Sequence, residues 1–292
     1  METKVNFYDH IGANKRNSFF LILCVFAMIL FLGYMIGWIF GNVYVGVILA
    51  VFIALLLTAI TFSAGDNIIV TMSGAKAASK KEHAYLINTV EGISIAAGIT
   101  MPKVYVIEDP TINAFAIGKK PENASVAVTT GALKKLTRSE LEGVLAHEIS
   151  HIKNYDVLFM MITIVMIGVV VMLSDFLLRS FVFGGGKKRE GHGALVFIAL
   201  ALSLLSPIAA YFIKLAVSRK REYLADANGA LLTRHPQGLA DALKKIKQDH
   251  TTPTLTANKA VSHLYFSNPF KKSDWHSTHP HIDDRIARLE KM

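Results

Sequence analysis

The chain has 292 residues, of which 52% are hydrophobic and only 18% are charged, and its mean hydropathy is +0.40. Soluble domains carry about 25% charged residues, so this composition excludes an ordinary soluble protein and indicates an integral membrane protein. The net charge of +9 comes from scattered Lys and Arg residues, which membrane phosphates explain better than a nucleic acid does.

Four apolar stretches are long enough to cross the hydrocarbon layer as helices of about 20 residues. They cover residues 19–40, 43–64, 157–178 and 194–217. Only Gly41 and Asn42 separate the first two stretches, which predicts a helical hairpin retained in the membrane rather than a cleaved signal peptide. The single cysteine, Cys24, lies in the first stretch, so an intramolecular disulfide bond is excluded.

Any soluble domain must be formed by the two polar segments, residues 65–156 and 218–292. The predicted organisation is an N-terminal membrane region, the first part of the domain, a second membrane region and the second part of the domain, at 1–64, 65–156, 157–217 and 218–292. The expected fold class is therefore a predominantly α-helical integral membrane protein with four transmembrane helices and one α+β domain outside the bilayer.

The first polar segment has the periodicity of a helix followed by short strands. Apolar residues at helical spacing predict a helix over 82–97, which Gly98 ends. Strands are predicted in three runs separated by turns: KVYVI (103–107), NAFAIG (113–118) and ASVAVTT (124–130).

Three further helices are predicted in the polar segments. One begins at Thr137, because Thr137 and Glu140 form a capping box. The sequences LADALKKIKQ (239–248) and IDDRIARLEK (282–291) have the spacing of amphipathic helices.

Basic residues flanking the apolar stretches predict that both chain ends lie in the cytoplasm. Lys and Arg residues precede the first stretch and follow the fourth, and four crossings return the chain to its starting side. The loop between the third and fourth stretches conflicts with this rule, because it also carries four basic residues. Either the rule is overridden locally, or the second pair does not cross the bilayer completely, and the sequence leaves both alternatives open.

The sequence HEISH has the spacing of a metal-binding helix. His147 and His151 are four residues apart, so both imidazoles lie on one face of a helix and can bind one metal ion. Glu148 lies next to them, where its carboxylate can take a proton from a water molecule. The other face of this helix is apolar, which favours a metal site over a surface helix with two solvated histidines.

A catalytic zinc site needs three protein ligands and one open position for water. The best candidate for the third ligand is Glu222 in SRKREYLADANGA, because two membrane crossings separate it from His151 and return the chain to the same side. Asp226 lies four residues later on the same helix face, where it can accept the remaining N–H of a ligating histidine. The alternative is a solvated acidic face with no role at the metal.

Taken together, these segments resemble a known family. HEISH followed by an apolar stretch, a second stretch ending in SRKREYLADANGA, INAFAIG ahead of HEISH and STHPHIDDRIARL near the C-terminus are similar to the HtpX membrane zinc metalloproteases, relatives of the CAAX prenyl-protein endopeptidases. The resemblance covers nearly the whole chain. It implies a multi-pass endopeptidase of the bacterial inner membrane, with a cytoplasmic gluzincin-type domain, acting on misfolded membrane proteins alongside an ATP-dependent membrane protease.

The resemblance also implies roles for individual residues. One Zn²⁺ per chain would be held by His147, His151 and Glu222, and Glu148 would be the catalytic glutamate. Four residues, Asn113, Ala114, Phe115 and Ala116, would form an edge strand that pairs with the substrate backbone, although an ordinary core strand is an equal alternative.

Two residues near the C-terminus have two alternative roles in this scheme. His279 and Arg285 could stabilise the oxyanion formed on the scissile carbonyl, or they could tie the C-terminal helix to the domain.

Three functions are compatible with the sequence. The first is a zinc endopeptidase for damaged membrane proteins, and the second is a CAAX-type prenyl-peptide protease, for which four membrane stretches are few. The third is a non-catalytic membrane scaffold with a structural zinc ion. A structural site would need a fourth protein ligand and would have no use for Glu148, which favours a catalytic site.

Overall fold

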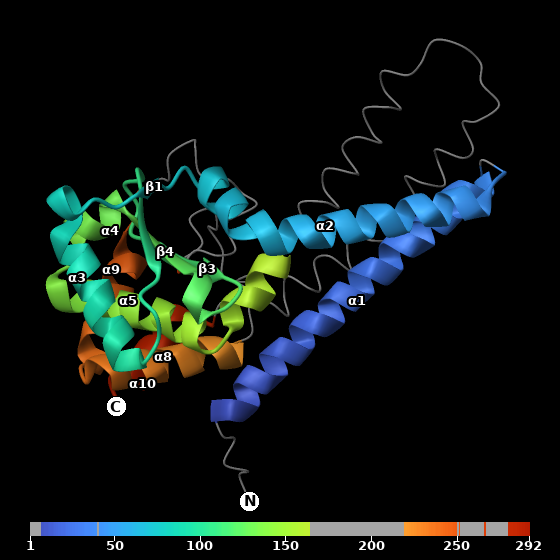
Figure 1. Ribbon diagram of the computed structural model, residues 1–292. Coiled ribbons are helices and arrows are strands. Elements are labelled where there is room, and N and C mark those ends of the chain that lie inside the picture. Colours follow the sequence, from blue (N-terminus) through green and yellow to red (C-terminus); the bar gives the residue numbers. More distant parts are fainter. Residues whose placement is uncertain (1–6, 40, 164–218, 250, 252–265, 267–279) are drawn as a thin grey trace, which may run out of the picture. The chain divides into compact units, whose positions relative to one another are not determined.

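The computed structural model describes residues 7–39, 41–163, 219–249, 251, 266 and 280–292 (Figure 1). The chain divides into two compact units. One comprises residues 1–15, 66–161 and 216–292, and the other comprises residues 16–65 and 162–215. Nearly all of the third and fourth apolar stretches lies outside the described residues, so the structure bears on the first two only.

The first two apolar stretches form helices long and apolar enough to cross a membrane. These are α1 (Phe7–Ile39) and α2 (Val43–Met72), and their most apolar parts have mean hydropathies of 2.5 and 2.8. Large apolar side chains stand exposed along both helices, among them Trp38 at 65% and Phe52 at 64%. A core helix of a soluble protein would bury these side chains, so their exposure is typical of helices that face lipid.

Both helices extend beyond the apolar stretches that predicted them. Hydropathy marks the length of chain that matches the hydrocarbon layer, whereas a helix ends where its backbone is interrupted. α2 continues to Met72 with Ile69 and Val70 buried, and Gly74 follows with a φ of 67°. This left-handed conformation suits glycine and stops the helix.

The larger unit contains a four-stranded sheet. Its strands are β1 (Lys76–Ala77), β2 (Lys103–Ile107), β3 (Ala114–Gly118) and β4 (Ala124–Thr129), in the spatial order β1-β2-β4-β3. β2 and β4 are parallel, whereas β3 pairs antiparallel with β4, with Phe115 opposite Ala127. The three predicted strands are confirmed, and β3 is at one edge of the sheet.

Six described helices complete this unit. They are α3 (Lys80–Ala97), α4 (Thr130–Lys135), α5 (Arg138–Lys153), α8 (Arg219–Thr233), α9 (Pro236–Gln248) and α10 (Ile282–Leu289). α5 is the central element, because it contacts α3, α8, α9 and the strand β3, as can be followed in Figure 1. Almost every residue of α5 from Glu140 onward is buried, so its position is set by contacts on all sides.

The start of α5 is fixed by the predicted capping box. The Thr137 hydroxyl accepts a hydrogen bond from the Glu140 backbone N–H, and the Glu140 carboxylate accepts one from the Thr137 N–H at 2.6 Å. Lys245 on α9 lies 2.7 Å from the same carboxylate. The cap therefore defines where α5 begins and also joins α5 to α9.

Replacing Gly143 with alanine is expected to destabilise this unit. A Cβ atom at Gly143 would lie 2.6 Å from the backbone nitrogen of Leu239, so α5 and α9 would have to move apart. The expected loss is about 1–3 kcal/mol of unfolding free energy, measured by thermal unfolding in detergent.

The matched control is Gly92→Ala on the exposed face of α3, where no atom lies within 4 Å of an added Cβ atom. That substitution is expected to be neutral or to stabilise by up to about 1 kcal/mol. Equal losses at the two glycines would contradict the close approach of α5 and α9.

Candidate metal centre

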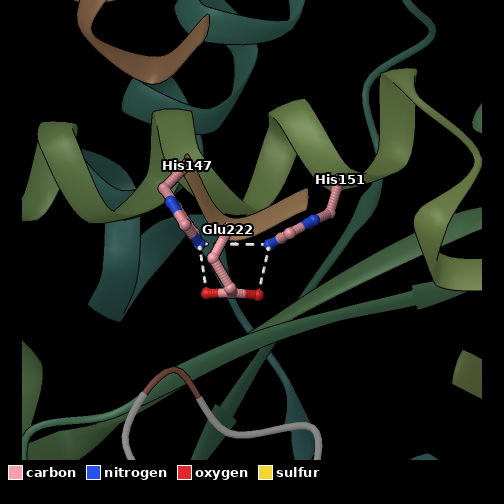
Figure 2. A group of neighbouring side chains, drawn as sticks. All are labelled: His147, His151 and Glu222. Atoms are coloured by element: carbon pink, nitrogen blue, oxygen red, sulfur yellow. Dashed lines mark hydrogen bonds and ion pairs between the residues drawn. The ribbon is translucent and has the colours of Figure 1, made fainter. Parts of the chain in front are cut away.

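Three side chains from two helices converge on one point, as Figure 2 shows. His147 and His151 project from α5 with their Nε2 atoms 3.1 Å apart. The Glu222 carboxylate from α8 faces them, with its oxygens 3.7 Å from His147 Nε2 and 3.6 Å from His151 Nε2. All three side chains are buried, and their ligand atoms lie within 4.8 Å of one another. Glu222, the predicted third ligand, thus lies beside the two histidines.

The close approach of α8 to α5 depends on a small residue. Gly229 lies on α8 against the backbone of His147, where an added Cβ atom would be 3.1 Å from the His147 nitrogen. Glu222 lies seven residues before Gly229, which is about two helical turns. The helix contact at Gly229 therefore brings the Glu222 carboxylate to the side of α5 that carries the histidines.

The second nitrogen of each histidine is bound to a buried carboxylate. His147 Nδ1 lies 2.9 Å from Asp226 Oδ1, as expected for Asp226, and His151 Nδ1 lies 2.9 Å from Asp156 Oδ2. An imidazole that donates its Nδ1 proton to a carboxylate presents the lone pair of Nε2 to a metal ion. The donor set of two imidazole nitrogens and one carboxylate oxygen therefore fits a divalent cation.

Arg285 ties α10 to this arrangement through Asp226. Its Nε and Nη2 atoms donate to the two carboxylate oxygens of Asp226 at 2.9 Å and 2.7 Å. Its Nη1 atom lies 3.6 Å from Glu222 Oε2, and its guanidinium lies over the ring of Phe266. The paired hydrogen bonds hold the plane of the Asp226 carboxylate and, with it, the ring of His147.

The charges around the two histidines are unequal. Burial lowers the pKa of His147 to about 4, and the charge of Arg285 adds to this against the hydrogen bond with Asp226. Burial also acts against a charge on His151, but the hydrogen bond to Asp156 and the charge of Glu222 outweigh it and raise the pKa of His151 to about 9. In the absence of a metal ion, the pair therefore carries one positive charge at pH 7, and this charge resides on His151.

Glu148 lies beside the ligands and does not belong to their cluster. It is 3% exposed, and its carboxylate accepts a hydrogen bond from the backbone N–H of Ala116 on β3. Burial raises the pKa of Glu148 to about 7, opposed by the charge of His151. A carboxylate with a pKa near neutrality can both take up and release a proton under ordinary conditions.

The edge strand β3 turns some of its backbone groups toward this site. Ala116 donates to Glu148, and the Ala114 carbonyl accepts a hydrogen bond from the backbone N–H of Phe266 at 2.9 Å. All five residues of β3, including the intervening Phe115, are buried. Asn113 instead bonds with Thr129 on β4 through its backbone. The backbone groups at Ala114 and Ala116 thus make hydrogen bonds outside the sheet, to Phe266 and Glu148.

A hollow at this place is lined by both predicted and unpredicted residues. Its lining consists of Ala116, His147, Glu148, His151, Met160, Glu222 and Phe266. Neither Met160 nor Phe266 was predicted: Met160 lies in an apolar stretch, where one more apolar residue is ordinary, and no motif surrounds Phe266. Asp156 was also not predicted as the partner of His151, although a ligating histidine is expected to have a hydrogen-bond partner on its second ring nitrogen. His279 lies outside the described residues, so its role stays a prediction.

Comparisons with known proteins agree with this site. The model of peptidase family M48 matches residues 80–292. A protease HtpX homolog of Dictyoglomus thermophilum is 44% identical over 288 residues, which is 98% of this chain and 95% of the relative. Homologs from Caldanaerobacter subterraneus and Listeria monocytogenes are 42% and 43% identical over 99% and 98% of this chain, and over 99% of each relative.

One solved structure is also similar. The crystal structure of S. mikatae Ste24p matches 90% of this chain with a TM-score of 0.53 and 20% sequence identity. This chain spans 62% of the length of Ste24p. At this identity the likeness concerns the fold alone.

Binding of a divalent ion at pH 7 is expected to release about one proton, because the ion must displace the proton that His151, with its pKa raised to about 9, carries. Since a metal ion competes with this proton, affinity should rise with pH up to the pKa of His151 and then level off. Calorimetry in two buffers of different ionisation enthalpy measures the number of protons released. Binding without proton release at pH 7 would contradict a site that uses the Nε2 atom of His151.

Proposed function

The chain belongs to peptidase family M48 as an HtpX homologue, a membrane-anchored metalloendopeptidase, and from this premise we propose a zinc enzyme that cleaves misfolded or damaged membrane proteins. The observation that carries the proposal is the separation of roles in one buried site. Three side chains are arranged as ligands, and a fourth carboxylate, Glu148, lies beside them without joining the cluster.

Zinc is the metal that this donor set favours. Catalytic zinc sites use three protein ligands of the nitrogen and oxygen type and keep one position for water or substrate, whereas structural sites are closed by four. Among the described residues the cluster has three members, His147, His151 and Glu222. Manganese and cobalt also accept such donors, so metal analysis of the purified protein is the direct check.

The proposed chemistry is hydrolysis without a covalent intermediate. A bound zinc ion would act as a Lewis acid toward the peptide carbonyl and toward water. Glu148 would take a proton from the attacking water molecule and pass it to the leaving amine, for which a pKa of about 7 is suited. The backbone groups of Ala114 and Ala116 would hold the substrate in extended form, in the manner of an added strand.

The proposed location is the cytoplasmic face of a bacterial inner membrane. It is supported by α1 and α2 and by the basic residues that flank the four apolar stretches. We further propose that all four stretches cross the bilayer, that the catalytic domain is of the gluzincin type and that an ATP-dependent membrane protease shares its substrates. These proposals rest on the resemblance described above.

Glu148→Gln is expected to abolish cleavage and to leave metal binding intact, because the amide cannot take a proton from water but preserves the shape of the side chain. The measurement is cleavage of an unfolded, casein-like protein by the detergent-purified enzyme, with zinc content assayed in the same samples. Glu142→Gln is the matched control, since Glu142 lies exposed on the same helix α5, and this variant should cleave as the wild type does.

The outcomes distinguish the alternatives. Equal cleavage by wild type and Glu148→Gln would assign the activity to another site or to a contaminant. If both bind zinc and neither cleaves casein or a membrane-embedded substrate, the zinc is structural and the scaffold function is the better one.

For Arg285 we propose a role through Asp226 rather than on the oxyanion, because its side chain is buried in the paired hydrogen bonds with that carboxylate. Arg285→Met is then expected to weaken zinc binding by about tenfold, as loss of a partner of a ligand does. Zinc affinity is measured by competition with a chelator, and Lys291→Met, at an exposed position just beyond the end of α10, is the control. Unchanged zinc affinity together with a kcat lowered by about 10²-fold would instead support the oxyanion role.

A further inference from the structure

The carboxylate behind His151 is held by residues from three separate parts of the chain. Asp156 follows the end of α5 and is 1% exposed. Its Oδ2 atom binds His151 Nδ1 at 2.9 Å, and its Oδ1 atom accepts a hydrogen bond from the side-chain amide of Asn14 at 2.6 Å. The Nε atom of Arg221, next to the ligand Glu222 on α8, lies 3.7 Å from the same Oδ1 atom. Each oxygen of Asp156 therefore has its own partner.

Asn14 also holds the backbone that carries Asp156. Its amide donates a second hydrogen bond, at 2.9 Å, to the carbonyl oxygen of Asn154, which caps the end of α5. The next residue, Tyr155, has a φ of 61°, a left-handed conformation that costs a non-glycine residue free energy. Lys15 lies over the ring of Tyr155 with its Nζ atom 4.1 Å from the ring centre. Two consecutive residues of α1 thus contact the turn between His151 and Asp156.

An amide is well suited to this position. It donates hydrogen bonds without carrying charge, so it fixes the plane of the Asp156 carboxylate and adds no positive charge to that of Arg221. A lysine at the same place would add a second positive charge. Asn14 is 6% exposed, and a buried amide of this kind is expected to have its hydrogen bonds satisfied, as both are here.

We infer that Asn14 is a positioning residue of the metal centre: through Asp156 it fixes the ring of His151, so that the start of the first membrane helix is part of the metal site. The inference rests on the proposed assignment of His151 as a metal ligand. It assigns to Asn14 a function besides membrane anchoring.

The test uses the full-length protein in detergent and compares Asn14→Ala with Asn17→Ala. Asn17 is exposed on the same helix, three residues further on, so the control has the same substitution without the contact. Asn14→Ala is expected to raise the zinc dissociation constant by about tenfold, in the range known for partners of metal ligands, and to change the visible spectrum of bound Co²⁺. Asn17→Ala should change neither. Asn14→Ser, whose side chain is too short to reach Asp156, serves as a second variant and should behave like Asn14→Ala.

A double-mutant cycle separates positioning from a general structural role. If Asn14 acts through Asp156, then Asn14→Ala should cost zinc affinity in the wild type and cost no more in the Asp156→Ala background. The same loss in both backgrounds, or wild-type zinc affinity in both Asn14 variants, would overturn the inference and leave the proposed function intact. Failure of the wild type itself to bind zinc would overturn both.

Discussion

Burial of charge at one point is the constraint on which the rest of the structure depends. Four carboxylates, from Glu148, Asp156, Glu222 and Asp226, lie buried within one cluster, where each would pay a large cost of desolvation if unbalanced. Two guanidinium groups, from Arg221 and Arg285, face them. When both histidines are neutral and all four carboxylates, Glu148 included, are ionised, two negative charges remain, and a divalent cation restores neutrality. The charge composition of the site therefore agrees with its ligand geometry, although neither was used to infer the other.

The fold supplies the rigidity that this concentration of charge requires. α5 is capped at its start, buried along its length and contacted by the sheet and by three other helices, so the two imidazoles leave it in fixed directions. α8 approaches closely enough to contribute Glu222 because Gly229 removes a side chain from the contact with His147. α10 contributes Arg285, which completes the charge balance from the far end of the sequence. No single segment of the described chain could build the site by itself.

Local patterns predicted the elements and the histidine pair on α5, whereas Glu222 on α8 was predicted from the expected membrane topology. The capping box of Thr137 and Glu140 predicts the start of α5. Because His147 and His151 are four residues apart, helix geometry places them on one face. Asp226 was also predictable, because it lies on the face of α8 that carries Glu222. The partner of His151 was not, since Asp156 reaches it around a turn in which Tyr155 adopts an unusual conformation. Asn14 and Phe266 lie more than 100 residues from His151 in sequence, and contacts of that range leave no trace in periodicity or spacing.

The backbone hydrogen-bonding groups of β3 that point away from the sheet bear on which membrane proteins such an enzyme would not cleave. The groups at Ala114 and Ala116 belong to the main chain, and their side chains are methyl groups. In the proposed function, substrate pairing there would therefore sense whether a segment is extended and not which residues it contains. A folded neighbour in the membrane has its backbone already paired in helices or sheets and offers no free strand. Healthy proteins would thus be spared by their own hydrogen bonding, and discrimination would reside in the state of the substrate instead of a recognition sequence.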